Sequence, residues 1–97
     1  MVYRTTPVDD SNVMDIIAKR IKELRVNQNL TIDQLSDQTQ ISERMFGNYE
    51  NARNLITIET IVKLFNAQVF EDHLDLEDLV NVLIVEPIKE ANGIDEE

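Results

Sequence analysis

The chain has 97 residues, enough for a single domain with a modest hydrophobic core. It contains no cysteine, one histidine and two glycines, which excludes disulfides and thiolate zinc sites and leaves no glycine-rich phosphate loop. We therefore expect no enzyme activity, no metal and no cofactor.

The net charge of −10 argues against a nucleic-acid partner only if the acids are spread over the whole surface. They are not, because residues 13–70 carry seven basic and seven acidic side chains and are neutral as a group. Residues 71–97 carry ten acidic side chains and one basic side chain, Lys89. The acidity therefore belongs to the C-terminal part of the chain.

The first ten residues, MVYRTTPVDD, lack the basic start and apolar stretch of a signal peptide. No apolar run approaches the roughly 20 residues that a membrane-spanning helix needs. We therefore expect a cytoplasmic protein that does not bind membranes.

The first predicted helix follows a cap at Asp10, Ser11 or Asn12 and ends near Asn27 or Asn29, because asparagine tolerates the left-handed backbone of helix ends. Its apolar residues recur at helical spacing: Val13, Ile17, Ile21 and Leu24.

Two short helices are predicted next. Thr31 and Gln34 have the spacing of a capping box, and the helix that they begin buries Ile32 or Leu35. Ser42 begins the third helix. The candidates for its inner face are Met45, Phe46 and Tyr49.

Thr57 begins a fourth predicted helix and Asp75 a fifth, which Pro87 ends. The apolar face of the fourth is predicted to hold Ile58, Ile61, Val62 and Phe65. That of the fifth holds Leu76, Leu79, Val80 and Leu83. The β-branched run at residues 80–85 leaves a strand as the alternative, and the last residues, ANGIDEE, suggest a frayed tail.

The fifth helix is apolar nearly all round, more than a helix covering one small core requires. Either it completes its own domain or it joins two copies of the chain in a homodimer. The candidates for a dimer interface are Leu79, Val82, Leu83 and Val85. Four roles are open for the acids of this segment: they keep the protein soluble, keep DNA off that side, bind a basic protein partner, or fold back on their own domain in competition with DNA.

The run IAKRIKELRVNQNLTIDQLSDQTQISERMFGNYENARNLITIETIVKLF, within residues 13–70, resembles the Cro and phage-repressor type (Xre-type) helix-turn-helix family. The marks of the family are IKELR, LT-x-x-QL, IS, YEN and TIETI, in that order. The resemblance implies an all-α fold, a five-helix lambda-repressor-like DNA-binding domain with a C-terminal acidic helix and tail. The expected division is a flexible N-terminal arm at 1–10, the helix-turn-helix domain at 11–70 and the acidic segment at 71–97.

In this family the third helix enters the major groove of double-stranded DNA. The implied DNA-binding residues are Ser42, Glu43, Arg44, Met45, Asn48, Asn51 and Arg53. Arg25 and Glu50 match a structural ion pair of the family. Each DNA contact has a simpler alternative. Ser42 caps the helix, Met45 lies in the core, and the carboxylate of Glu43 interacts favourably with the helix dipole. The other side chains are solvated.

The resemblance implies a sequence-specific transcriptional regulator, a repressor that binds a palindromic operator as a homodimer. The alternative is a helix-turn-helix scaffold for protein interaction, similar to an antirepressor. Four residues depart from the family pattern or from helix preference. Ile32 replaces a phosphate-binding glutamine, Gln40 and Ala52 replace glycines, and Gly47 lies within the third helix.

Overall fold

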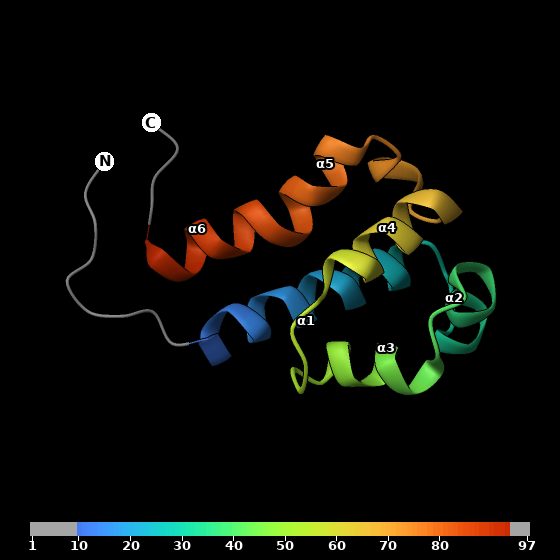
Figure 1. The fold of residues 1–97 in the computed structure, drawn as a ribbon, viewed down its shortest axis with the longest axis horizontal. Helices are drawn as coiled ribbons and strands as arrows, with labels where there is room; N and C mark the ends of the chain where they lie inside the picture. The colour runs from blue at the N-terminus through green and yellow to red at the C-terminus, as the bar shows by residue number, and fades with distance from the viewer. Residues whose placement is uncertain (1–9, 94–97) are drawn as a thin grey trace.

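The computed structural model describes residues 10–93, which form helices with no strand among them (Figure 1). The helices of the first part are α1 (Asp10–Asn27), α2 (Ile32–Thr39), α3 (Glu43–Glu50) and α4 (Ile58–Ala67). A 3-10 turn, η1 (Glu71–His73), leads to α5 (Leu76–Val80), a π-helical turn η2 (Asn81–Val85) and α6 (Glu86–Asn92). Because α5, η2 and α6 follow without a break, they correspond to the single fifth helix of the prediction.

The all-α class is confirmed, and the alternative strand at residues 80–85 is wrong because those residues are helical. α1 begins at Asp10, so Ser11 and Asn12 belong to its first turn and do not precede it. Its predicted end is confirmed, since it stops at Asn27 and Asn29 has a left-handed φ of 57°. The arm predicted at residues 1–10 lies outside the described residues, apart from Asp10.

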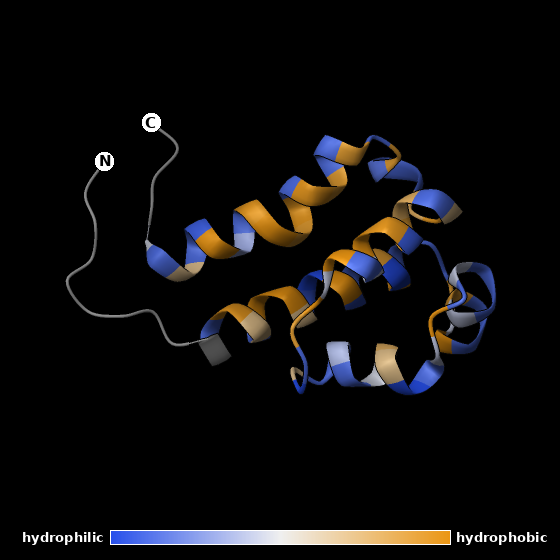
Figure 2. Cartoon of the chain, in the orientation of Figure 1, coloured by the Kyte–Doolittle hydropathy of each residue, from blue (hydrophilic) through white to orange (hydrophobic). Residues whose placement is uncertain are grey.

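α1 lies between the two halves of the fold, with α3 on one side and the α5–α6 segment on the other (Figure 1). Figure 2 shows hydrophobic residues gathered on α1, α4 and the α5–α6 segment, whereas α2 and α3 are more hydrophilic. The core draws residues from all of them: Ile17, Ile21, Leu35, Phe46, Tyr49, Ile61, Leu64, Val69, Phe70, Leu79 and Leu83. The C-terminal segment therefore contributes to the same core as the helix-turn-helix part.

The predicted inner face of α4 is wrong in part. Ile61 is buried as expected, but Ile58 is 84% exposed and Val62 is 48% exposed. Thr60 and Leu64 are buried in their place. The polar Thr60 can lie inside because its Oγ1 and the Oη of Tyr49 are 2.7 Å apart and share a hydrogen bond.

Pro87 does not end the last helix, which continues to Asn92 and stops at the left-handed Gly93. The π-helical turn accommodates the proline, since Glu86 donates its N–H to Asn81 O, five residues before. Pro87 has no N–H for Val82 O, and Arg20 Nη1 donates to that oxygen at 3.4 Å. Of the predicted frayed tail, Ala91 is buried and residues 94–97 lie outside the described part.

Arg20 also ties α1 to α6 through two carboxylates. Its Nη1 lies 2.6 Å from Glu86 Oε1, and its Nη2 lies 3.4 Å from Glu90 Oε2. The hydrogen bond to Glu86 raises the pKa of Arg20 above its ordinary value. This cation and two of the C-terminal acids therefore serve the packing of α6 on α1.

Candidate nucleic-acid interface

α2 is held at its start by the predicted capping box. Gln34 N donates to Thr31 Oγ1 at 3.1 Å, and Thr31 N donates to Gln34 Oε1 at 2.9 Å. One turn further, Leu35 is completely buried, whereas Ile32 is only partly buried against the core. α2 is thus fixed both by its cap and by one core anchor.

The turn between α2 and α3 is tight. Gln40 adopts a left-handed backbone with φ 65°, and its side-chain Nε2 donates to Asp37 O at 3.0 Å. Ile41 is buried directly after it, and Ile41 N donates to Thr39 Oγ1 at 3.3 Å. Ser42 then caps α3, because its Oγ accepts from Met45 N at 3.1 Å. These bonds fix the direction in which α3 leaves the turn.

α3 has only eight residues, too few to be a stable helix without tertiary contacts. Phe46 and Tyr49 supply them, with 0% and 2% of their surfaces exposed, and their rings meet edge to face at 6.4 Å. Met45 is partly buried and lines a groove between α3 and the beginning of α4. It therefore lies to one side of the helix face that points outward.

An ion pair fixes the end of α3 to the end of α1. Arg25 Nε and Nη2 donate to the two carboxylate oxygens of Glu50 at 2.7 and 2.9 Å, and Arg25 Nη1 donates to Leu30 O at 2.8 Å. The side chains are 15% and 6% exposed. The hydrogen bond to Glu50 raises the pKa of Arg25 further above its ordinary value, so the arginine stays charged. The pair that the resemblance implied is thus present in bidentate geometry.

The opposite face of α3 points away from the core. Arg44, Gly47, Asn48 and Asn51 share it at spacings i, i+3, i+4 and i+7, with Glu43 beside them. A Cβ added at Gly47 would meet no atom within 4 Å, so packing within the described residues does not require a glycine there. Asn51 Nδ2 donates to Gly47 O at 2.8 Å and so helps to end the helix.

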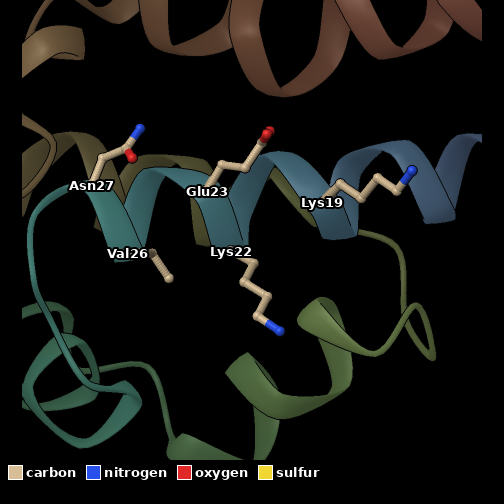
Figure 3. A pocket seen from close by; sticks show the side chains of 5 residues that line it. All are labelled: Lys19, Lys22, Glu23, Val26 and Asn27. Carbon is tan, nitrogen blue, oxygen red and sulfur yellow. The ribbon is translucent and has the colours of Figure 1, made fainter.

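The exposed cations near this face are not neutralised. Arg44 and Arg53 are exposed, and neither has a carboxylate partner within residues 10–93. On α1, Lys19 and Lys22 line a shallow depression, where Lys22 points toward α3 and Lys19 does not (Figure 3). Of these two lysines, only Lys22 is directed from α1 toward α3 (Figure 3).

The four predicted dimer residues have different environments. Leu79 and Leu83 are 1% and 0% exposed in the core of one chain, so they are not available to a second copy. Val82 and Val85 are partly buried, and Val82 packs against the core. The burial of Leu79 and Leu83 corrects the prediction that they form a dimer surface. The apolar character of the segment is explained mainly by its contact with α1 and α4.

Ala52 has a left-handed backbone with φ 56°, directly after α3, and no polar side chain to offset the strain. We expect Ala52→Gly to raise the free energy of unfolding by about 1 kcal/mol, because glycine adopts this conformation without steric cost. Urea unfolding of both proteins measures the difference. The matched control is Ala18→Gly inside α1, which should lower the free energy of unfolding, because glycine is unfavourable within a helix. A loss of stability in both variants would contradict the strain argument.

Within residues 10–93, no helix has both the length and the apolar character needed to cross a membrane. The same residues contain no group of three or more side chains suited to hold a metal ion. His73, the single histidine, lies in η1 and its Nδ1 is 2.5 Å from Asp78 Oδ2.

Two short capped helices, a left-handed turn between them, and a second helix pinned to α1 with its polar face outward define a helix-turn-helix domain. The helix-turn-helix family model matches residues 21–67, from the second half of α1 to the end of α4. Residues 21–67 are therefore a helix-turn-helix domain of the Cro/Xre type, a domain type of DNA-binding regulators. No curated protein and no solved structure matches the chain.

Proposed function

We propose that the protein is a sequence-specific transcriptional regulator of the cytoplasm that binds a palindromic operator as a homodimer and represses transcription. The observation that carries this proposal is the outer face of α3, where Arg44 is exposed and Asn48 is partly exposed. The buried residues of the inner face hold the helix in place. A rigid helix with polar residues pointing away from its own core is suited to the major groove.

The side chains of this face match the donors and acceptors of base edges. Arg44 can donate two hydrogen bonds to guanine O6 and N7, Asn48 can pair with adenine N6 and N7, and Glu43 can accept from cytosine N4. Gly47 between them lets the backbone of α3 approach the bases closely. Arg53 would contact a phosphate. Ser42 and Asn51 would also contact phosphates, through the polar atoms that their hydrogen bonds within α3 do not use.

The arrangement of charge also supports DNA binding. The exposed acids of η1 and α5 lie beside α4, in the segment that continues into η2 and α6, which pack on the side of α1 away from α3 (Figure 1). They therefore repel DNA from that side and not from α3, and the net charge of −10 does not describe the proposed binding face.

Selection of bound sequences from random duplex DNA at low salt, with the oligomeric state measured in parallel, tests this function. We expect an enriched motif with two half-sites about one helical turn apart, and an affinity that falls steeply with salt. Failure to enrich any motif would overturn the proposal.

One observation favours the second candidate, a helix-turn-helix scaffold that binds protein. Ile32, the first residue of α2, cannot donate a hydrogen bond to phosphate through its side chain, and it packs against the core. In this case the acidic C-terminal segment offers a surface to a basic protein partner. A selection without a motif, together with binding to such a protein, would establish this candidate in place of the first.

A further inference from the structure

Two exposed leucines lie at the beginning of α5. Leu74 precedes the N-cap residue Asp75 and Leu76 follows it, and each leucine is 44% exposed. Because the leucines are two residues apart, their Cα atoms lie within about 7 Å of each other. The core takes its apolar residues from either side of this stretch, where Phe70 and Leu79 are 2% and 1% exposed. The two leucines are therefore apolar side chains that the fold leaves at the surface in one small area.

Charged side chains of one sign surround the two leucines. All five acids of residues 71–78 are exposed: Glu71, Asp72, Asp75, Glu77 and Asp78. Asp78 Oδ2 lies 2.5 Å from His73 Nδ1, and none of the five has a lysine or arginine partner within residues 10–93. We name Leu74, Leu76 and these five acids the acid–leucine face.

The backbone that carries this face is fixed by the fold. At the end of α4, the side-chain Nε2 of Gln68 donates to Leu74 O at 3.0 Å. Asp75 Oδ1 accepts from Glu77 N at 3.1 Å and so caps α5, and Leu79 fixes the next turn in the core. A partner would therefore bind this face without first having to order its backbone, which lowers the entropic cost of association.

We propose that the acid–leucine face binds a basic segment of another protein, which places apolar side chains on Leu74 and Leu76 and lysine or arginine side chains beside the acids. The charge of the face decides among the occupants. A second copy of this chain, with its net charge of −10, is negative, as are DNA and an anionic membrane, so all three are repelled. With a basic protein segment, the charges speed the encounter and select the partner, and the apolar contact adds affinity.

The acid–leucine face is separate from the proposed DNA-binding face. It lies beside α4, and α5 and α3 are on opposite sides of the molecule in Figure 1. The inference takes up the basic partner of the second candidate function and gives it a surface. It rests on the proposed function only for the place of recruitment, since the partner is brought to the operator if α3 binds DNA.

The probe for this face is a synthetic amphipathic peptide of lysine and leucine, and its control is a scrambled peptide of the same composition. Fluorescence anisotropy of each labelled peptide, titrated with the full chain at about 0.15 M salt, measures the affinities. We expect the amphipathic peptide to bind about tenfold more tightly, because only this peptide presents its leucines as one stripe. Equal affinities would overturn the inference, since a cluster of acids alone does not distinguish two peptides of the same charge.

Leu74→Ser/Leu76→Ser tests the apolar part of the face. This double variant keeps every charge, and we expect it to weaken binding of the amphipathic peptide about tenfold. Val26→Ser is the matched control, because Val26 is a 52% exposed residue of α1, and it should leave the affinity unchanged. Circular dichroism shows whether both variants keep their fold. A folded double variant that binds the peptide as tightly as the wild type would overturn the inference.

Asp72→Asn/Glu77→Gln tests the acids without changing an apolar contact or the cap at Asp75. We expect it to weaken binding and to reduce the dependence of the affinity on salt, because two charges of the face are lost. Asp33→Asn/Asp37→Asn on α2 removes the same number of exposed acids elsewhere and should have little effect. Equal effects of the two pairs would show that only the net charge attracts the peptide, which would contradict a defined binding face.

Separate ligands distinguish the failure of this inference from the failure of the proposed function. Arg44→Ala should change the binding of operator DNA and leave the binding of the peptide as it is. If no DNA motif is selected but the leucine variant loses the peptide, the proposed function fails and the acid–leucine face stands. If a motif is selected but the chain does not distinguish the two peptides, the acid–leucine face fails and DNA binding stands.

Discussion

Replacing Arg25 with methionine is expected to lower the free energy of unfolding by about 3 kcal/mol, the largest effect on stability predicted for this chain. The carboxylate of Glu50 is 6% exposed and would remain in place without a cation. Leu30 O would lose its donor as well. For a domain of this size, such a loss corresponds to a fall of the melting temperature by about 15 °C, which a thermal scan followed by circular dichroism measures.

The double variant Arg25→Met/Glu50→Leu separates the cost of a lone buried charge from the net contribution of the pair. We expect it to recover most of the loss, because apolar side chains of similar size replace both partners. Arg20→Met is the matched control, since Arg20 and Glu86 are 26% and 41% exposed, and its cost should be only about 1 kcal/mol. Equal losses for Arg25→Met and Arg20→Met would show that burial does not determine the effect.

The ion pair also bears on function, because α3 is short and depends on its surroundings for both stability and direction. Phe46 and Tyr49 hold its inner face, and Glu50 fixes its last turn to α1. A variant without the pair should therefore bind DNA less well even at temperatures where it remains folded. That loss would reflect orientation, since Arg25 and Glu50 are not proposed to contact DNA.

The features predicted correctly from sequence are those that depend on residues close in the chain. The caps at Thr31, Ser42 and Thr57 are confirmed, since each needs only a hydroxyl and a backbone N–H three residues away. The partner of Arg25 is 25 residues distant, and its assignment came from the family pattern and not from spacing. Gln40 and Ala52, which replace glycines of the family pattern, both adopt a left-handed backbone.

The features predicted wrongly depend on contacts between distant elements. A period of apolar residues placed Ile58 and Val62 inside, but the partner of the buried Thr60 is Tyr49 of another helix, which no local pattern shows. Pro87 was expected to end a helix, and the compensating donor for Val82 O is Arg20 of α1. In both cases a polar group from elsewhere in the fold offsets a local cost, and such pairing is set by tertiary structure.

Two exposed arginines, one on α3 and one just after it, should have different effects on DNA binding, and this is the largest functional effect that we predict. Arg44→Ala is expected to remove discrimination of about 1–3 kcal/mol at one base pair of the operator, because it removes a bidentate contact to guanine. Arg53→Ala should weaken binding to all sequences alike and lower the salt slope by about 1. Competition gel shifts with single-base variants of the selected operator, repeated over a range of salt, measure both quantities.

Lys89→Ala provides the control, because Lys89 lies in α6 on the other side of α1 from α3 (Figure 1). It should change neither the preferred base nor the salt slope. If Arg44→Ala combined with Asn48→Ala still prefers the selected operator, the outer face of α3 is not what reads the sequence. The exposure of those residues would then serve solubility or a protein partner, and specificity would have to come from another surface. If the two arginine variants instead have the different effects expected, the arginines have distinct roles. Arg20 and Arg25 then hold α1 to its neighbours, whereas Arg44 contacts bases and Arg53 contacts the DNA backbone.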